Sequence, residues 1–178
     1  SIEKSMGRGV SRPPRHGGCG LFPGRTPLPS NGHGETAAGG YATHMYRGPI
    51  PYLGPDGKLL NYLFAARERG VIFDVGHGEG SFVFRNAVPS IEQGFWPDTI
   101  SSDLHTSSMN GPMMDLPTVM SKFLAMGMPL KAVIEAATAR PAQVIGRPDL
   151  GHLTVGAVAD LAAFNLLQGK FGFCDAGM

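Results

Sequence analysis

The chain has 178 residues, a hydrophobic content of 42% and a formal net charge of +1. This length allows one domain with a sizeable core, but a closed eight-stranded α/β barrel needs roughly 250 residues, so any barrel here would be incomplete. The near-neutral charge gives no reason to expect nucleic acid or an anionic membrane as a partner. The two cysteines, Cys19 and Cys174, exclude a disulfide framework. With no apolar run near the roughly 20 residues of a membrane span, we expect a cytoplasmic protein.

The N-terminal segment, residues 1–39, differs in composition from the rest. It has no hydrophobic period of 2 or 3.6 between residues 5 and 40, and Glu35 is its only acidic residue there. Such a stretch cannot bury enough apolar surface to offset the entropy of ordering it, so we expect it to be disordered or irregular. The alternative is a basic nucleic-acid-binding arm, which four scattered arginines support only weakly.

Strand, helix and strand patterns then alternate through residues 40–150. Residues 41–46 have the pattern of a short buried strand, and Asp56 is a candidate cap for a helix that Gly70 ends. The apolar run Val71–Val75 predicts a second strand directly after that helix. Strand, helix, strand is the unit of a parallel sheet, so we predict the α/β class.

The same unit repeats further along the chain. We predict a helix from a cap at Ser81 to Gln93, a strand at 99–102, a helix from a cap at Asp115 to Gly127, a helix at 130–138, a shorter helix from Pro141 to near Gly146, and a strand-like run at 161–166. Residues 151–178 form a third region, because glycine-punctuated turns replace the helical pattern from Gly151 onward.

Polar side chains follow three of the predicted strands. His44, His77 and Asp103 lie at the strand ends, and His105 lies two residues beyond. Because parallel strands place these ends together, and because imidazole and carboxylate are the ligands that zinc prefers, the pattern indicates a metal site. A carboxylate beside a metal-bound water can also accept its proton, so Asp103 is the first candidate for a general base. The alternatives are structural histidines and an Asp103 that caps its own loop.

The loop after the second strand contains Gly76, Gly78 and Gly80. Glycine lets the backbone come close to a bound molecule, so we expect Gly76 and Gly78 to lie near the substrate. A phosphate-binding loop is the alternative, but the Lys-Ser/Thr pair of a P-loop does not follow. A nucleotide-binding module that uses Gly76–Gly80 is accordingly a third hypothesis.

From about Gly40 onward the sequence resembles the amidohydrolase superfamily, specifically its deacetylase and dihydroorotase-like branch. The resemblance is carried by ATHMY (42–46), AARERGVIFDVGHGEGSF (65–82), GFWPDTISSDLHT (94–106), MSKFLAMGMPL (120–130), ATARPAQVIGRPDLGHL (137–153) and VGAVADLAAF (155–164). It implies an incomplete (β/α)8 TIM barrel at 40–150, made of strands 6–8 and their helices. It also implies that 151–178 starts the return to a small β-sandwich.

The resemblance also implies the roles of the site residues and the cofactor. On the family pattern His44 is a metal ligand on the sixth strand, and Asp103 on the eighth strand is both a metal ligand and the general base. His77, with Gly76 and Gly78, is expected near the substrate, and His105 on the substrate side of the following loop. The family site holds one or two divalent metal ions, usually zinc.

The chain departs from the family pattern in its first part. The His-x-His pair of the first strand is missing, since His16 and His33 stand alone, and Lys4 is the only candidate remnant of the bridging lysine. We therefore predict a fragment of a metal-dependent amidohydrolase that hydrolyses amide or ester bonds of a small molecule, with Asp103 as general base. The alternative is an inactive remnant that folds partially, or forms a homo-oligomer through the open edge of strand 41–46.

Overall fold

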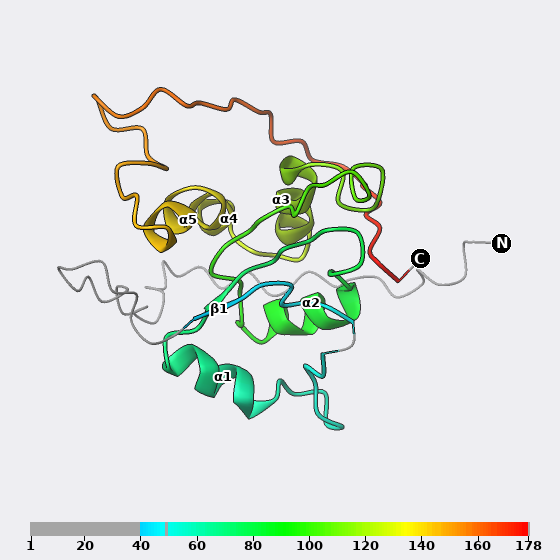
Figure 1. The fold of residues 1–178 in the computed structure, drawn as a ribbon. Helices are drawn as coiled ribbons and strands as arrows, with labels where there is room; N and C mark the ends of the chain where they lie inside the picture. The colour runs from blue at the N-terminus through cyan, green and yellow to red at the C-terminus, as the bar shows by residue number, and fades with distance from the viewer. Residues whose placement is uncertain (1–39, 49, 178) are drawn as a thin grey trace, which may run out of the picture. The chain divides into compact units, whose positions relative to one another are not determined.

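A computed structural model of the chain describes residues 40–48 and 50–177. The predictions for segment 1–39 and Lys4 lie outside these residues. The elements in chain order are β1 (Tyr41–Ala42), α1 (Asn61–Glu68), β2 (Ile72–Phe73), α2 (Phe84–Glu92), α3 (Leu116–Ala125), α4 (Leu130–Ala137) and α5 (Ala139–Val144), as Figure 1 shows. Among the helices described, none has the length and apolar character needed to cross a membrane.

A short parallel sheet lies at the centre of the described part. Strand β1 pairs with β2 in parallel, with Tyr41 opposite Ile72. A parallel bridge between Asp74 and Thr99 adds the segment 99–102 on the other side of β2. This order confirms the first predicted strand–helix–strand unit and the α/β class, whereas the predicted strand at 99–102 forms one bridge, at Thr99, and no regular strand. The regular strands are shorter than predicted, because the backbone enters the left-handed region soon after β1, at His44 (φ 57°).

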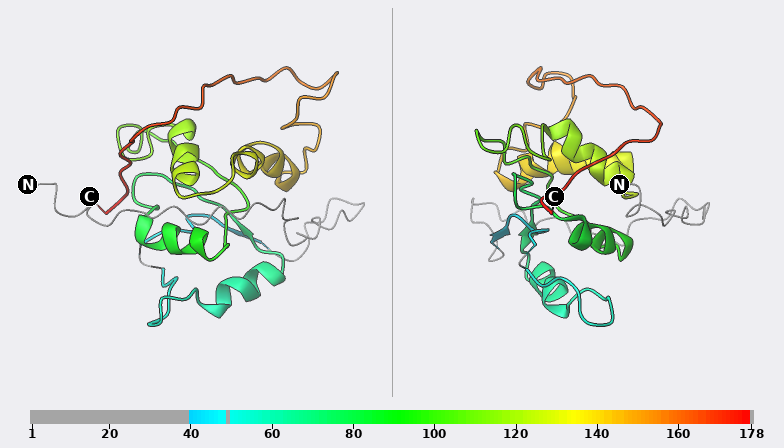
Figure 2. Two further views of the ribbon diagram at one scale, coloured as in Figure 1. Left: turned by 180° about the vertical axis from the view of Figure 1, so that it is seen from behind. Right: turned by 90° about the vertical axis from the view of Figure 1, so that its right-hand side faces the viewer.

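The helices follow one another around the sheet in chain order. Both views in Figure 2 place α1 and α2 toward one side of the strands and α3, α4 and α5 toward the other. The core between them is rich in aromatic rings, and Tyr46 is its centre, with ring centroids of Tyr52, Phe82 and Phe123 at 5.7 to 6.1 Å. All four side chains are at most 3% exposed. Burial of this aromatic cluster holds the loops between the elements in place.

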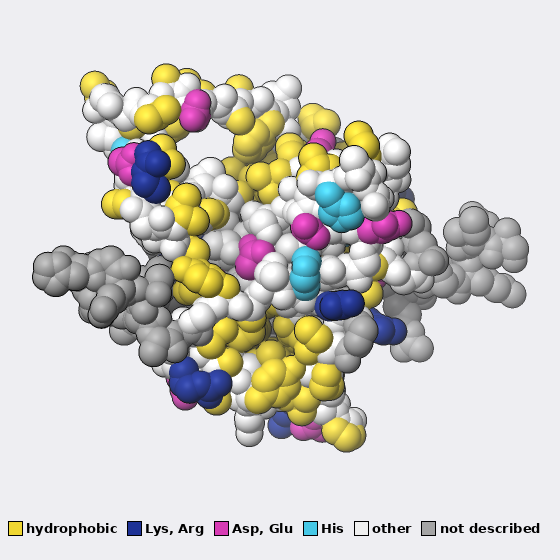
Figure 3. Space-filling model, viewed as in Figure 1, with side chains coloured by type: hydrophobic (Ala, Val, Ile, Leu, Met, Phe, Trp, Pro, Cys, Tyr) yellow, Lys and Arg dark blue, Asp and Glu magenta, His cyan; other side chains and the backbone are white. Residues whose placement is uncertain are grey.

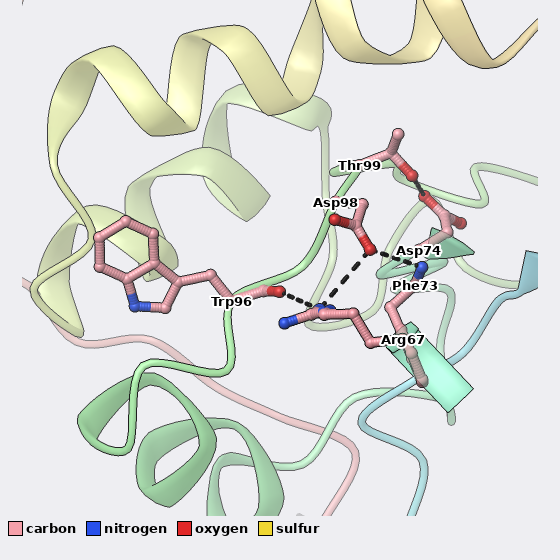
Figure 4. Close-up of polar contacts among 6 residues, drawn as sticks. All are labelled: Arg67, Phe73, Asp74, Trp96, Asp98 and Thr99. Atoms are coloured by element: carbon pink, nitrogen blue, oxygen red, sulfur yellow. Dashed lines mark hydrogen bonds and ion pairs between the residues drawn. The ribbon is translucent and has the colours of Figure 1, made fainter. Parts of the chain in front are cut away.

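Arg67, at the end of α1, fixes the start of the segment 99–102. Its guanidinium donates to the carbonyl oxygen of Trp96 at 2.6 Å and lies 3.6 Å from the carboxylate of Asp98. That carboxylate in turn accepts the N–H of Phe73 at 2.9 Å. Figure 4 shows the contacts that connect Arg67 with Phe73 on β2 and with Trp96 and Asp98 before Thr99. The guanidinium also lies 3.7 Å from the ring centroid of Phe95, so the helix end is held by cation–π attraction as well.

The helix starts show where local capping rules apply. Asp115 caps α3 as predicted, since its carboxylate accepts the N–H of Thr118 at 2.7 Å. The predicted caps Asp56 and Ser81 are wrong. Helix α1 begins only after Leu60, and Asp56 instead accepts the N–H of Lys58 within a turn.

Helix α2 also begins later than predicted, at Phe84. No side chain next to it in sequence caps it. The carboxylate of Asp175 accepts the N–H of Phe84 at 2.7 Å, across 91 positions in the sequence. A distant residue therefore does what the sequence pattern assigned to Ser81.

The predicted strand at 161–166 is wrong, because residues 151–177 contain no helix or strand. A strand needs a neighbour for its N–H and C=O groups, and no described segment pairs with this one. Its apolar side chains are exposed, with Leu161 at 71% and Leu167 at 69%. The assignment of 151–178 to the start of a β-sandwich remains a prediction.

Candidate active site

The candidate residues follow the strands at one edge of the parallel sheet. His44 comes two residues after β1, His77 comes four residues after β2, and Asp103 comes directly after the segment 99–102. Backbone N–H groups of the loop after β2 donate to carbonyl groups of 99–102 at 2.9 to 3.3 Å, so the pairing continues up to Asp103. Figure 3 shows histidine and acidic side chains gathered on one exposed face.

His44 is held in one ring orientation by the loop after β2. Its Nδ1 lies 2.7 Å from the carbonyl oxygen of Gly76. Because a carbonyl oxygen only accepts, Nδ1 carries the proton, and in the neutral ring Nε2 keeps its lone pair. This is the arrangement in which metal-binding histidines are oriented by a carbonyl on their other nitrogen. No hydrogen bond to Nε2 is found within 40–48 and 50–177.

Gly76 has a close contact that explains why a glycine is needed there. Its φ is 46°, and an added Cβ would collide with Thr43 Oγ1 and lie 2.8 Å from His44 Nδ1. Only a residue without a side chain therefore lets its carbonyl reach the imidazole.

Asp103 lies against the second glycine of the same loop. An added Cβ at Gly78 would lie 2.6 Å from Asp103 Oδ2, and Asp103 itself has a positive φ of 50°. The exposed loop after Asp103 is closed by the buried Ser108, whose hydroxyl accepts the N–H of His105 at 2.9 Å and lies 3.1 Å from the Asp103 carbonyl oxygen. A non-glycine residue in the left-handed region is costly, and such residues concentrate at functional sites.

Asp74 connects the three strand segments beneath these side chains. Its Oδ2 accepts hydrogen bonds from Thr43 at 2.8 Å and Ser101 at 2.7 Å, and its Oδ1 accepts one from Thr99 at 2.6 Å. Figure 4 shows the contact with Thr99. Ser101 Oγ also accepts the N–H of Gly76 at 3.0 Å, so the carboxylate is linked through one hydroxyl to the loop that orients His44.

His77 is the most enclosed of the predicted site residues. Its side chain is fully buried and stacks on Phe82 with ring centroids 4.5 Å apart. Its Nδ1 lies 2.8 Å from the Gly78 carbonyl oxygen and its Nε2 lies 2.7 Å from Lys122 Nζ. Burial, with the nearby Lys122 charge, lowers the pKa of His77 to about 4. Both ring nitrogens are therefore engaged by the protein, and the predicted role of His77 near the substrate stays a prediction.

His105 is exposed on the loop after Asp103. Its Nδ1 accepts the N–H of Ser107 at 3.3 Å, which leaves Nε2 on the solvent side as the protonated nitrogen of the neutral ring. The predicted place of His105 on the substrate side agrees with this exposure but is not tested by it.

The donor types at this edge fit part of a zinc shell. His44 offers an oriented imidazole nitrogen and Asp103 an exposed carboxylate, whereas a catalytic zinc site needs about three protein ligands. Within the described residues no group of three or more His, Cys, Asp or Glu side chains is arranged to hold a metal ion. The described part of the chain therefore supplies two candidate ligands.

Sequence reasoning missed Asp74 and Lys122. Asp74 stands inside the apolar run Val71–Val75, and a charged residue within a buried strand is a signal that its side chain is bonded. Lys122 stands three positions after Val119 on the apolar side of its helix, where a cation requires buried acceptors. Ser108 carried no signal, because serine is common in loops.

The fold and the site together define an α/β protein whose histidine and aspartate candidates follow successive parallel strands. The sequence model of the amidohydrolase family matches residues 80–175. The chain therefore belongs to the amidohydrolase family.

Similar proteins extend the match toward the N-terminal side of that range. A deacetylase of Brucella anthropi is 40% identical over 139 residues, covering 78% of this chain and 35% of the relative. The crystal structure of a dihydroorotase aligns with a TM-score of 0.63 and 38% identity, over 76% of this chain and 36% of that one. An adenine deaminase structure aligns with a TM-score of 0.62 and 32% identity, over 67% and 33%. The chain spans about a third of the length of these proteins.

Proposed function

We propose that this chain carries part of the active site of a metal-dependent amidohydrolase that hydrolyses an amide or ester bond of a small molecule. The observation that carries the proposal is His44, whose Nδ1 is bonded to Gly76 while Nε2 keeps its lone pair at the same sheet edge as Asp103. A bound divalent metal, with zinc as first choice, would polarise the substrate carbonyl and lower the pKa of water.

Each residue then has a defined task. His44 is a ligand whose ring direction is set by the Gly76 carbonyl oxygen. Asp103 is a ligand and the general base, because its carboxylate is exposed and can accept a proton from water and pass it to the leaving group. Because Gly78 has no side chain, one side of the Asp103 carboxylate packs against its backbone. His105 faces solvent on the same loop and is proposed to contact substrate.

The substrate class follows from the names of the similar proteins. Deacetylase, dihydroorotase and adenine deaminase all denote cleavage next to an acyl carbon or at a carbon–nitrogen bond. We therefore infer deacetylation or opening of a cyclic amide as the reaction. An incomplete TIM barrel is the architecture that supports it, with the described strands as its sixth to eighth.

The test is metal content by elemental analysis of the purified, chelator-treated and zinc-reloaded chain. Because the described residues supply two candidate ligands, we expect the unchanged chain to hold zinc weakly, and His44→Ala and Asp103→Ala to lose it. Matched controls are His152→Ala and Asp160→Ala, both exposed in the segment without helix or strand. Zinc in all five proteins, or in none, would contradict a site formed by His44 and Asp103. Hydrolysis of N-acetyl and cyclic-amide compounds would then be measured on the zinc-loaded chain.

The second candidate is an inactive remnant that associates with itself. It is favoured by the exposed apolar side chains of residues 153–171, among them Leu153 at 80% and Val155 at 102% exposure. Sedimentation velocity over a range of concentrations tests it, with the variant Leu161→Asp, Leu167→Asp as comparison. Oligomers that dissociate in the variant and are unaffected by chelator would favour this reading over the metal enzyme.

A further inference from the structure

Lys122 is a fully buried lysine on α3 whose ammonium group bonds to three separate parts of the chain. Nζ lies 2.7 Å from each of three acceptors, which are His77 Nε2, the Pro112 carbonyl oxygen and the Cys174 carbonyl oxygen. An ammonium has three N–H donors, so this set uses all of them. The acceptors belong to the loop after β2, the loop before α3 and the C-terminal segment.

The bond to His77 has a fixed direction. Gly78 O can only accept, so His77 Nδ1 carries the ring proton and Nε2 is the acceptor for Lys122. Burial lowers the pKa of both groups, that of His77 to about 4 and that of Lys122 to about 8. At neutral pH the pair is therefore a neutral imidazole and an ammonium.

The charge of Lys122 is stabilised by dipoles and rings rather than by a contacting carboxylate. Its Nζ lies 5.3 Å from the ring centroid of Phe82 and 5.9 Å from that of Phe84. Asp175 is the carboxylate that acts on it electrostatically, but Asp175 bonds to the N–H groups of Phe84 and Gly177. A buried cation held in this way is costly unless every acceptor keeps its position.

Two of the acceptors belong to the two loops that are connected with the candidate general base. The backbone N–H of His77 donates to Ser101 at 3.3 Å, and the next residue, Gly78, contacts the Asp103 carboxylate. Pro112 lies in the loop that leads from Asp103 to α3. Lys122 therefore bonds both to the loop that contacts the Asp103 carboxylate and to the loop that begins at Asp103.

We propose that Lys122 is a positioning residue that holds the 103–112 loop against the loop after β2 and so fixes the direction of the Asp103 carboxylate. It does not itself touch the reacting atoms. The proposal rests on the proposed function only in the role given to Asp103. The bonded network can be tested whether or not the chain binds metal.

The first test compares Lys122→Met with Lys131→Met in the full chain. Lys131 is a matched control because its side chain is 79% exposed and forms an ion pair with Glu135 on its own helix. We expect faster amide hydrogen exchange throughout 103–112 in Lys122→Met, with α1 unchanged. The ¹⁵N resonance of His77 Nε2 should move downfield, because the acceptor nitrogen loses its donor. If neither readout differs from Lys131→Met, the proposal is overturned.

Variants at His77 keep the proposal testable if Lys122→Met does not fold. In His77→Gln the side-chain amide oxygen can take the place of Nε2 as the acceptor for Lys122. In His77→Phe the ring still stacks on Phe82, but the acceptor is removed. We expect wild-type exchange of the 103–112 amides in His77→Gln and accelerated exchange in His77→Phe. Equal exchange in the two variants would contradict a role for the bond.

Zinc affinity, measured by competition with a chromophoric chelator, connects the network to the site. If the unchanged chain binds zinc, Lys122→Met should bind it about tenfold more weakly, the usual effect of removing an outer-shell partner. Equal zinc affinity would overturn the positioning role while leaving the proposed function intact. If the unchanged chain binds no zinc, the proposed function fails, and the exchange and ¹⁵N results decide the loop-holding role by themselves.

Discussion

Gly78 and Asp103 are in such close contact that a Cβ built on Gly78 would lie 2.6 Å from the Oδ2 atom of Asp103. Both residues have left-handed backbones, with φ of 49° and 50°. The Asp103 carboxylate thus packs against the backbone of Gly78. This contact restricts the direction of the carboxylate and leaves its lone pairs available. This contact makes the glycine a sensitive probe of the site.

Gly78→Ala is expected to displace the Asp103 carboxylate. The left-handed backbone alone should lower the free energy of unfolding by about 1–2 kcal/mol. The contact adds a second effect, because Oδ2 must move away from the new methyl group. We expect about tenfold weaker zinc binding, measured by chelator competition, as for a disturbed outer shell.

Gly94→Ala is the matched control for that substitution. Gly94 also has a positive φ, of 75°, but an added Cβ there meets nothing within 4 Å. In Gly94→Ala the free energy of unfolding in urea should fall because of the left-handed backbone, whereas zinc affinity should stay unchanged. Equal zinc affinities in the two variants would mean that the Gly78 contact does not position Asp103.

Asp74→Asn should weaken the connection among the strand segments. The carboxylate accepts three hydroxyl hydrogen bonds, and an amide has only one accepting oxygen. We expect the free energy of unfolding, measured in urea, to fall by about 1–3 kcal/mol. Asp56→Asn is the control, since the exposed Asp56 accepts a single N–H at 3.1 Å, and it should change stability by less than about 0.5 kcal/mol. A similar loss in both variants would reject the bridging role.

The parallel order of the strands was predictable because it depends on local patterns. The helix stop at Gly70 directly precedes the apolar run Val71–Val75, and this order is typical of a strand–helix–strand unit. The cap at Asp115 was predictable for the same reason, because donor and acceptor are three residues apart. Features fixed by neighbours in sequence could therefore be predicted.

Features fixed by contacts between residues far apart in the sequence could not be predicted. The cap of α2 comes from Asp175, which no local rule connects with Phe84. The run 161–166 has strand composition, but a strand forms only with a partner, and composition does not supply one. At the site, the pattern located the strand ends, whereas the bond that engages His77 depends on Lys122, 45 positions away.

Acid should destabilise the fold through His77. Its pKa falls from the usual 6.5 to about 4, first because burial disfavours the charged ring and also because Lys122 is near. Between these pH values the unfolded chain binds a proton that the folded chain does not, so stability is lost as pH falls from 6.5 to 4. The loss is on the order of 2–3 kcal/mol, and urea midpoints across this range measure it.

His77→Gln removes this titration, so its urea midpoint should depend less on pH between 6.5 and 4. His152→Gln serves as the control, because His152 is exposed and its replacement leaves His77 in place. It should retain the pH dependence of the unchanged chain. Parallel curves for all three proteins would show that burial of neutral His77 does not contribute to acid sensitivity.

Asp175→Ala should destabilise α2 although the substitution lies far from that helix in sequence. The carboxylate accepts the Phe84 N–H at 2.7 Å, and the next residue, Ala176, donates its own N–H to Phe82 at 3.0 Å. We expect the free energy of unfolding in urea to fall by about 1 kcal/mol, as for loss of an N-cap, with faster hydrogen exchange at Phe84 and Ala176. Asp115→Ala, which removes the local cap of α3, should lower the free energy of unfolding by a similar amount. It should leave hydrogen exchange at Ala176 unchanged. If Asp175→Ala had no effect on Phe84, the C-terminal segment would not be what caps α2.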